Sequence, residues 1–151
     1  MIPAFRLLPV TESDYGAVFA LHQELFRAHI ERIWGWHPDW QKQNFRRNWA
    51  ACETRLIEVD GRPAGYLQTV QETDHLFLKN LGLLPCYQRL GIGSKLMRDL
   101  QCRAADLGLP VRLSVFTTNP DAVRFYERLG FVRADCTSEF QLMHWSAAPT
   151  A

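Results

Sequence analysis

The sequence lacks several features that would assign it to specialised classes of protein. Its four cysteines form no CxxC pair, and a chain of 151 residues does not need disulfide bonds to fold, so we expect reduced thiols. No apolar run approaches the ~20 residues of a membrane span. The N-terminus lacks the basic start and the long apolar run of a signal peptide. The sequence therefore predicts a cytoplasmic protein that has no membrane partner.

The chain also lacks a large excess of charge of one sign. Its 17 Lys and Arg stand against 16 Asp and Glu, which gives a formal charge of +1. Nucleic-acid-binding domains are usually strongly basic, so we expect no nucleic-acid partner. The five histidines show no zinc-binding spacing such as HExxH, and we expect no metal site.

The positive charge that is present is unevenly distributed. Residues 88–133 contain eight Lys and Arg and four Asp and Glu, so this segment carries 8 − 4 = +4 and the rest of the chain carries 1 − 4 = −3. A locally positive segment suits a compact anionic ligand better than a polyanion. An accidental gathering of charge on solvated helix faces is the alternative.

Length and periodicity predict one α+β domain spanning residues 1–151, because the chain is too short for two ordinary domains. The strand over 76–84 is almost continuously apolar and is therefore expected to be central. The helix over 91–107 is expected to turn Leu96, Leu100 and Leu107 inward. The predicted strands are 5–10, 54–59, 64–69, 76–84, 111–116, 131–136 and 137–145, and the predicted helices follow Asp14 and Pro38, cover 91–107, and follow a cap at Asn119.

A glycine-bearing loop follows the predicted central strand, in the stretch Gln88-Arg89-Leu90-Gly91-Ile92-Gly93-Ser94-Lys95. A helix comes next, and the free N–H groups at a helix N-terminus can bind phosphate. A Walker A loop would place the lysine before the serine, whereas Lys95 follows Ser94. The dinucleotide-binding fingerprint needs a third glycine where Leu96 stands. Both of these phosphate-binding motifs are excluded.

Two stretches together resemble one enzyme family. Gln88–Gly93 matches (Q/R)-x-x-G-x-(G/A), the acyl-CoA pyrophosphate signature of the GNAT N-acetyltransferase superfamily. Further along, Asn119-Pro120-Asp121-Ala122-Val123-Arg124-Phe125-Tyr126-Glu127-Arg128-Leu129-Gly130-Phe131 resembles that family's element of asparagine, alanine, (F/L)-Y-E and G-F. The predicted order of strands and helices also agrees with the family from Phe5 to Trp145.

The resemblance implies a mixed, mostly antiparallel sheet with helices on both faces. Two neighbouring parallel strands, 76–84 and 111–116, would splay apart, and acetyl-CoA would bind as co-substrate between them. Its pantetheine arm would pair with the backbone like an added strand, and its pyrophosphate would bind the N–H groups of the loop. The cofactor-binding residues that the resemblance implies are Leu81, Leu83, Gln88, Arg89, Leu90, Gly91, Ile92, Gly93, Ser94, Asn119, Phe125 and Arg128.

The activity that the resemblance implies is transfer of an acetyl group from acetyl-CoA to a primary amine, by direct attack in a ternary complex. Tyr126 matches the tyrosine that in many members protonates the leaving thiolate; the alternative is a tyrosine that only packs against the cofactor. Backbone N–H groups at Leu83 would stabilise the oxyanion. Phe77 stands near the position where well-known members carry a carboxylate base. His75 is then a candidate base, with a half-exposed strand histidine or a water relay as the alternatives.

The acceptor is not identified by the sequence. Trp34, Trp36 and Trp40 lie between the first two predicted helices, where the family often shapes its acceptor site, and they either hold an amine by cation–π contact or form core packing under a loop. Family members commonly pair, so a homodimer is a possible assembly. The alternative function is a non-catalytic acyl-CoA-binding or regulatory module of the same fold, because Phe77 cannot accept a proton.

Overall fold

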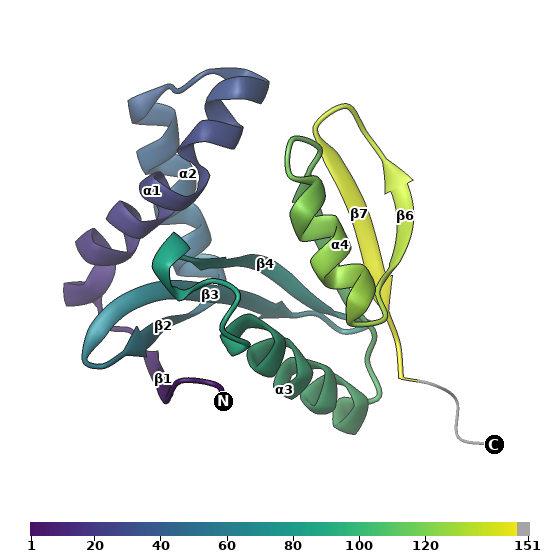
Figure 1. The fold of residues 1–151 in the computed structure, drawn as a ribbon. Coiled ribbons are helices and arrows are strands. Elements are labelled where there is room, and N and C mark those ends of the chain that lie inside the picture. Colours follow the sequence, from purple (N-terminus) through teal and green to yellow (C-terminus); the bar gives the residue numbers. More distant parts are fainter. Residues whose placement is uncertain (148–151) are drawn as a thin grey trace. The chain divides into compact units, whose positions relative to one another are not determined.

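A computed structural model describes residues 1–147, which form seven strands, four α-helices and two short 3-10 helices (Figure 1). Their order is the predicted one. The strands are β1 (Phe5–Pro9), β2 (Glu53–Val59), β3 (Arg62–Gln71), β4 (Leu76–Leu83), β5 (Val111–Phe116), β6 (Val132–Cys136) and β7 (Phe140–Trp145). The helices are η1 (Glu12–Asp14), α1 (Tyr15–Trp34), α2 (Pro38–Ala51), η2 (Pro85–Tyr87), α3 (Ile92–Leu107) and α4 (Pro120–Arg128).

The strands form a mixed sheet in the order β1-β2-β3-β4-β5-β7-β6. β4 is the fourth of the seven and pairs in parallel with β5, through Leu76–Leu78 and Val111–Leu113. The pairings β1–β2, β2–β3, β5–β7 and β6–β7 are antiparallel. The predicted fold class is therefore confirmed, with a central β4, a parallel pair, and four helices that flank the sheet.

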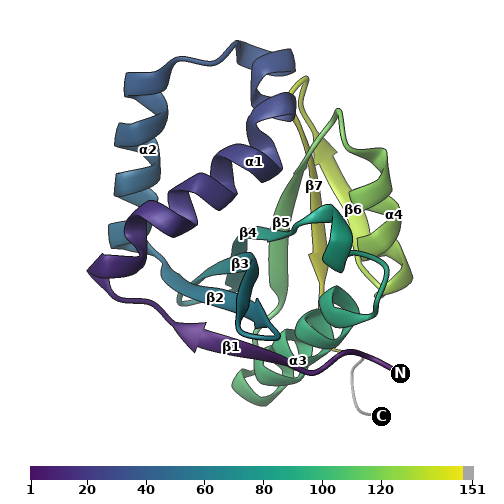
Figure 2. The same ribbon diagram turned by 60° about the vertical axis from the view of Figure 1, so that its left-hand side comes forward.

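The chain divides into two compact units that share β4. The first contains Met1–Val70 and Lys79–Gly93, and the second contains Gln71–Leu78 and the residues from Ser94 onward. In the first unit, α1 and α2 pack on the part of the sheet that contains β1, β2, β3 and the second half of β4. In the second unit, the first half of β4 joins β5, β7 and β6, and α4 lies beside β6 and β7 (Figures 1 and 2).

The core of the first unit lies where α1 and α2 pack on β3. Val18 and Leu21 of α1, Phe45 of α2 and Tyr66 of β3 form one buried cluster, and both helices lie side by side in Figures 1 and 2. Helix α1 ends at Trp34, and Gly35 follows it with a positive φ of 81°.

Strands β3 and β4 approach each other closely at two glycines, Gly65 and Gly82. An ideal Cβ built on Gly65 would lie 1.9 Å from the backbone oxygen of Gly82 and 3.0 Å from the Cα of Leu83. Real Cβ atoms do not approach backbone this closely, so position 65 requires glycine for reasons of space. Nearby, the Leu84 N–H donates to the Ala64 carbonyl at 2.8 Å and holds the two backbones together.

The second unit buries one face of α3 and of β5. Gln101 of α3 donates through Nε2 to the carbonyl of Leu129 at 2.8 Å, which ties α3 to the end of α4. Leu107 is 46% exposed, so the prediction that it faces inward is wrong: it is the last residue of α3 and lines a surface pocket instead. The buried apolar residues of α3, β5 and β7 in this unit are Leu96, Met97, Leu100, Ala104, Val111, Leu113, Val115 and Met143.

One histidine is buried in the apolar core of the first unit. His22 Nδ1 lies 2.8 Å from the hydroxyl of Tyr66, and the side chain of Gln41, which is 3% exposed, also bonds to it. Burial lowers the pKa of His22 from 6.5 to about 4, against the smaller raising effect of Gln41. The folded protein therefore holds this imidazole neutral at neutral pH.

We expect this histidine to make the fold sensitive to mild acid. The unfolded chain takes up the proton near pH 6.5 and the folded chain only near pH 4, so stability is complete above pH 6.5 and falls as the pH falls to 4. The lowering of the His22 pKa from 6.5 to about 4 corresponds to about 3 kcal/mol in the free energy of unfolding. Urea unfolding measured across this range should show the loss. A His22→Gln variant should lose less between the same two pH values, and an equal loss in both proteins contradicts the assignment.

Candidate functional site

The predicted phosphate-binding loop lies in the first unit, between the end of β4 and the start of α3. Gln88 donates through Nε2 to the carbonyl of Leu83 at 2.7 Å, which anchors the loop to the last residue of β4. Arg89 and Gly91 have φ angles of 62° and 89°. These left-handed residues turn the chain sharply, so that α3 begins at Ile92. The loop thus has the strand–turn–helix arrangement that an anion-binding loop requires.

Gly91 is the position in this loop with the strongest requirement for glycine. Its φ of 89° disfavours any residue with a Cβ, and a Cβ there would lie 3.0 Å from Cγ1 of Ile2. Arg89 and Leu90 are exposed. The first N–H groups of α3 have no partner within the helix, as at every helix N-terminus, and they are available to an anion.

Leu81 and Leu83 are half-buried residues of β4 in the same unit as the loop. The Gln88 amide already occupies one lone pair of the Leu83 carbonyl. A carbonyl has two lone pairs, so a second donor can still bind there. The sequence motif identified the loop, and the contact between its first residue and the strand was not predicted.

Asn119 and Tyr126 lie in the second unit, at the start and near the end of α4. The Asn119 side-chain oxygen accepts from the N–H of Ala122 at 3.2 Å, which confirms the predicted helix cap. Tyr126 is buried, and its ring makes T-shaped contacts with Phe125 and Phe131 at centroid distances of 5.0 and 5.6 Å. Burial raises the pKa of Tyr126 well above its ordinary value, so the phenol is fully protonated at neutral pH.

Ser94 and Arg128 are also residues of the second unit. Ser94 is half-buried in the first turn of α3, and Arg128 is exposed at the last residue of α4. The structure therefore brings Leu81, Leu83 and residues 88–93 together in one unit. Ser94, Asn119, Phe125, Tyr126 and Arg128 belong to the other.

His75 lies just before β4, at the strand's far end from the loop. Its Nδ1 is 2.7 Å from Oδ1 of Asp74, and this hydrogen bond lowers the pKa of the exposed Asp74 carboxyl. His75 belongs to the second unit, whereas Leu81 and Leu83 belong to the first. A general base needs hydrogen-bond reach, directly or through one water. The role of His75 as a base therefore stays a prediction.

The tryptophans of the α1–α2 connection are surface residues. Trp34 is 46% and Trp40 56% exposed, so the interpretation of these two as core packing is wrong. Trp36 is half-buried, and the guanidinium carbon of Arg27 lies 4.9 Å from its ring centroid. Indole side chains are thus exposed to solvent around the α1–α2 connection.

Comparison with known proteins identifies the family. A model of the acetyltransferase (GNAT) family matches residues 17–131, more than half of the chain. The chain belongs to this family. The match includes both of the motifs on which the sequence resemblance rests, Gln88–Gly93 and Asn119–Phe131.

Solved acetyltransferases have the same fold. The chain is 16% identical to a PaiA N-acetyltransferase from Thermoplasma acidophilum in complex with coenzyme A, with a TM-score of 0.77 over 95% of this chain and 99% of that one. For the ribosomal-protein-S18-alanine N-acetyltransferase from Escherichia coli the identity is 21% and the TM-score 0.72, over 97% of each chain. For a spermidine N-acetyltransferase from Vibrio cholerae in complex with CoA and spermine, the identity is 18% and the TM-score 0.67, over 93% of this chain and 94% of that one.

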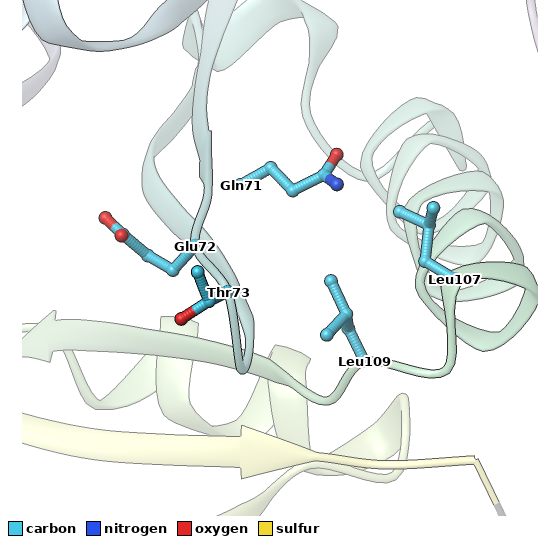
Figure 3. Close-up of a pocket in the computed structure, with 5 residues that line it drawn as sticks. All are labelled: Gln71, Glu72, Thr73, Leu107 and Leu109. Atoms are coloured by element: carbon cyan, nitrogen blue, oxygen red, sulfur yellow. The ribbon is translucent and has the colours of Figure 1, made fainter.

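Two surface pockets of this acetyltransferase contain none of the predicted site residues. One, in the second unit, has a volume of about 410 Å³ and is lined by Gln71, Glu72, Thr73, Leu107 and Leu109. In Figure 3 the Gln71 side chain points toward α3 and the Glu72 side chain points away from it. The other, in the first unit, is lined by Tyr15, Lys42, Gln43, Arg46 and Arg47.

Neither metal-binding clusters nor membrane-spanning helices occur in the described part of the acetyltransferase. Residues 1–147 contain no group of three or more His, Cys, Asp or Glu arranged to hold a metal ion. Within the same residues, every helix is too short or too polar to cross a membrane.

Proposed function

We propose that this protein transfers an acetyl group from acetyl-CoA to a primary amine, by direct attack of the amine on the thioester in a ternary complex. The observation that carries the proposal is the loop Gln88–Gly93, which leaves the central strand, turns through two left-handed residues and opens α3, in a chain of the acetyltransferase family. We also propose that the two units act together as one N-acetyltransferase domain spanning residues 1–151.

In this proposal, the pantetheine arm of acetyl-CoA pairs with β4 at Leu81 and Leu83. The N–H groups of residues 89–94 bind the pyrophosphate, with Gln88 holding the loop against β4. The amide nitrogen of Asn119 bonds the pantetheine, since its oxygen is already used in capping α4. Phe125 and Arg128 lie against the pantetheine or the nucleotide. The PaiA enzyme, solved with coenzyme A, supports this choice of co-substrate.

The chemistry follows from what acyl transfer to an amine requires. The amine must lose its proton before it attacks the carbonyl, and the N–H of Leu83 stabilises the oxyanion that then forms. Collapse of the intermediate breaks the C–S bond, and Tyr126 donates a hydrogen bond and proton to the leaving thiolate. The raised pKa of Tyr126 keeps the phenol protonated, so its hydroxyl is present to donate a hydrogen bond when the thiolate forms.

The proton of the attacking amine has no obvious protein acceptor. Phe77 cannot take it, and the imidazole of His75 already bonds the Asp74 carboxylate at 2.7 Å. We therefore favour a relay of ordered waters that leads the proton to solvent, with His75 as the less favoured base. A His75→Gln variant with unchanged turnover fits the relay.

The acceptor is proposed to approach past the exposed Trp34 and Trp40, whose ring faces attract a cationic amine. Trp36 completes this group, although Arg27 already lies over its ring. The amine class is supported by the spermine bound to the Vibrio cholerae spermidine N-acetyltransferase. A peptide N-terminus is an equally compatible primary amine.

The proposal is tested by incubating the protein with acetyl-CoA and a panel of primary amines, and by following the release of free thiol. We expect amine-dependent thiol release, with a matching acetylated product in the mass spectrum. Melting of the protein with acetyl-CoA alone separates binding from turnover, since a hundredfold excess over the Kd stabilises by about 2.7 kcal/mol. Absence of any stabilisation contradicts acetyl-CoA binding itself.

A non-catalytic acyl-CoA-binding or regulatory module is the second candidate function. It is favoured by Phe77 of β4, which stands at the place of a carboxylate base and cannot accept a proton. This candidate predicts stabilisation by acetyl-CoA without thiol release from any amine in the panel. Amine-dependent release contradicts it.

A further inference from the structure

The basic pocket of the first unit lies between α1 and α2 and has a volume of about 560 Å³. It is lined by one residue of α1, Tyr15, and by four residues of α2, Lys42, Gln43, Arg46 and Arg47. The four α2 residues are spaced i, i+1, i+4 and i+5, so they lie on one face of the helix. None of them belongs to the acyl-CoA motifs.

Arg46 is held in place within this pocket. Its guanidinium carbon lies 3.6 Å from the centroid of the Tyr15 ring, and its Nη1 forms an ion pair with Glu12. These two contacts fix the side chain before any ligand arrives, which reduces the entropy lost on binding. The guanidinium keeps further N–H donors beyond the one used by Glu12.

Lys42 and Arg47 are exposed at the same pocket, and neither has a carboxylate partner in the described part of the chain. With the Glu12 carboxylate counted against the three cations, the formal charge of the pocket is 3 − 1 = +2. Such a charge on one helix face is self-repelling. Gln43 adds an uncharged amide donor between the cations.

We propose that this pocket binds a phosphomonoester dianion, at a site separate from the acyl-CoA loop. The charge of a phosphomonoester at neutral pH, about −1.5 to −2, matches the +2 of the pocket, whereas a single carboxylate or a phosphodiester would neutralise only half of it. The planar guanidinium forks of Arg46 and Arg47 suit phosphate oxygens, and Lys42 supplies a point charge.

The ligand has two possible sources, inorganic phosphate and the phosphate group of a small organic molecule. The pocket is shallow and open to solvent, with a volume of about 560 Å³, so a small organic group attached to the phosphate can extend from it without a clash. We therefore assign an organic phosphomonoester, which binds through its phosphate.

The test is a titration of the ¹⁵N-labelled full chain at low ionic strength, with inorganic phosphate, ribose 5-phosphate and dimethyl phosphate as separate probes. Amide shifts report α2 and the 88–94 loop independently, so the result does not depend on whether the loop binds CoA. We expect saturable shifts at residues 42–47, with ribose 5-phosphate binding more tightly than inorganic phosphate and dimethyl phosphate binding at least tenfold more weakly than ribose 5-phosphate. Equal binding of the first two probes assigns the phosphate group alone.

The double variant Lys42→Gln/Arg47→Gln should weaken binding of ribose 5-phosphate at α2 at least tenfold. The matched control, Arg32→Gln/Arg62→Gln, removes two exposed cations of the same unit outside the pocket and should bind normally. Equal melting temperatures establish that both variants fold. The proposal is overturned if the two double variants bind alike, if dimethyl phosphate binds as tightly as ribose 5-phosphate, or if a glutamate-rich peptide binds α2 more tightly than either phosphate.

Discussion

Replacing Gly65 by alanine is expected to destabilise the protein by about 3 kcal/mol or more, or to prevent folding. The added Cβ would lie 1.9 Å from the backbone oxygen of Gly82 and 2.9 Å from its carbonyl carbon. Backbone atoms of paired strands cannot rotate away as a side chain can. The clash must therefore push β3 and β4 apart and break their hydrogen bonds.

Gly82 and Gly16 provide two controls for the Gly65→Ala prediction. A Cβ at Gly82 would meet Leu25 Cδ1 at 2.6 Å and Phe26 Cζ at 3.1 Å, both ends of side chains that can shift, so Gly82→Ala should cost less. A Cβ at Gly16 in α1 meets nothing within 4 Å, and Gly16→Ala should stabilise by about 0.5–1 kcal/mol. Urea unfolding of the three variants should give this order. A Gly65→Ala protein as stable as the wild type would refute the close approach.

The second large effect concerns Tyr126, and it depends on the proposed function. Tyr126→Phe should lower kcat by about 100-fold while leaving the affinity for acetyl-CoA nearly unchanged. The variant loses only the hydroxyl that we propose protonates the leaving thiolate. Phenylalanine keeps the ring contacts with Phe125 and Phe131, so the packing of α4 is preserved.

The measurement is steady-state turnover with the best amine of the panel, together with the Kd of acetyl-CoA and the melting temperature. If Tyr126 only packs against the cofactor, we expect the variant to keep its kcat and to lose acetyl-CoA affinity or stability. Unaltered turnover would remove Tyr126 from the mechanism.

The order of the elements was predictable because local signals mark most of their ends. Asp60 and Gly61, between β2 and β3, both have positive φ, as a tight Asp-Gly turn requires, and Asn119 caps α4 through its own side chain. The loop Gln88–Gly93 was found for the same reason, since a short motif combines its anchor and its glycines. Such features involve neighbours in the chain, so the sequence displays them directly.

Features that depend on distant partners were missed or misjudged. The spacing that predicted Leu107 as buried applies to the whole of α3, but this last residue extends beyond the buried face and is exposed. Trp34 and Trp40 looked equally suited to a core or a surface and lie on the surface. The count of charges along the sequence assigned the positive charge to residues 88–133 and did not reveal the basic face of α2. The i, i+4 spacing of Lys42 and Arg46 was a signal from which that face could have been predicted.

By itself, the sequence determined the class of fold, the order of the strands and helices, and the family, because periodicity, caps and motifs are properties of neighbouring residues. Only the tertiary structure decided which groups are buried and which backbones touch. It lowers the pKa of His22 by placing it in an apolar core, leaves room only for glycine at position 65, and gathers three cations into one pocket. Burial, close approach and local charge depend on the packing of elements that are far apart in the chain.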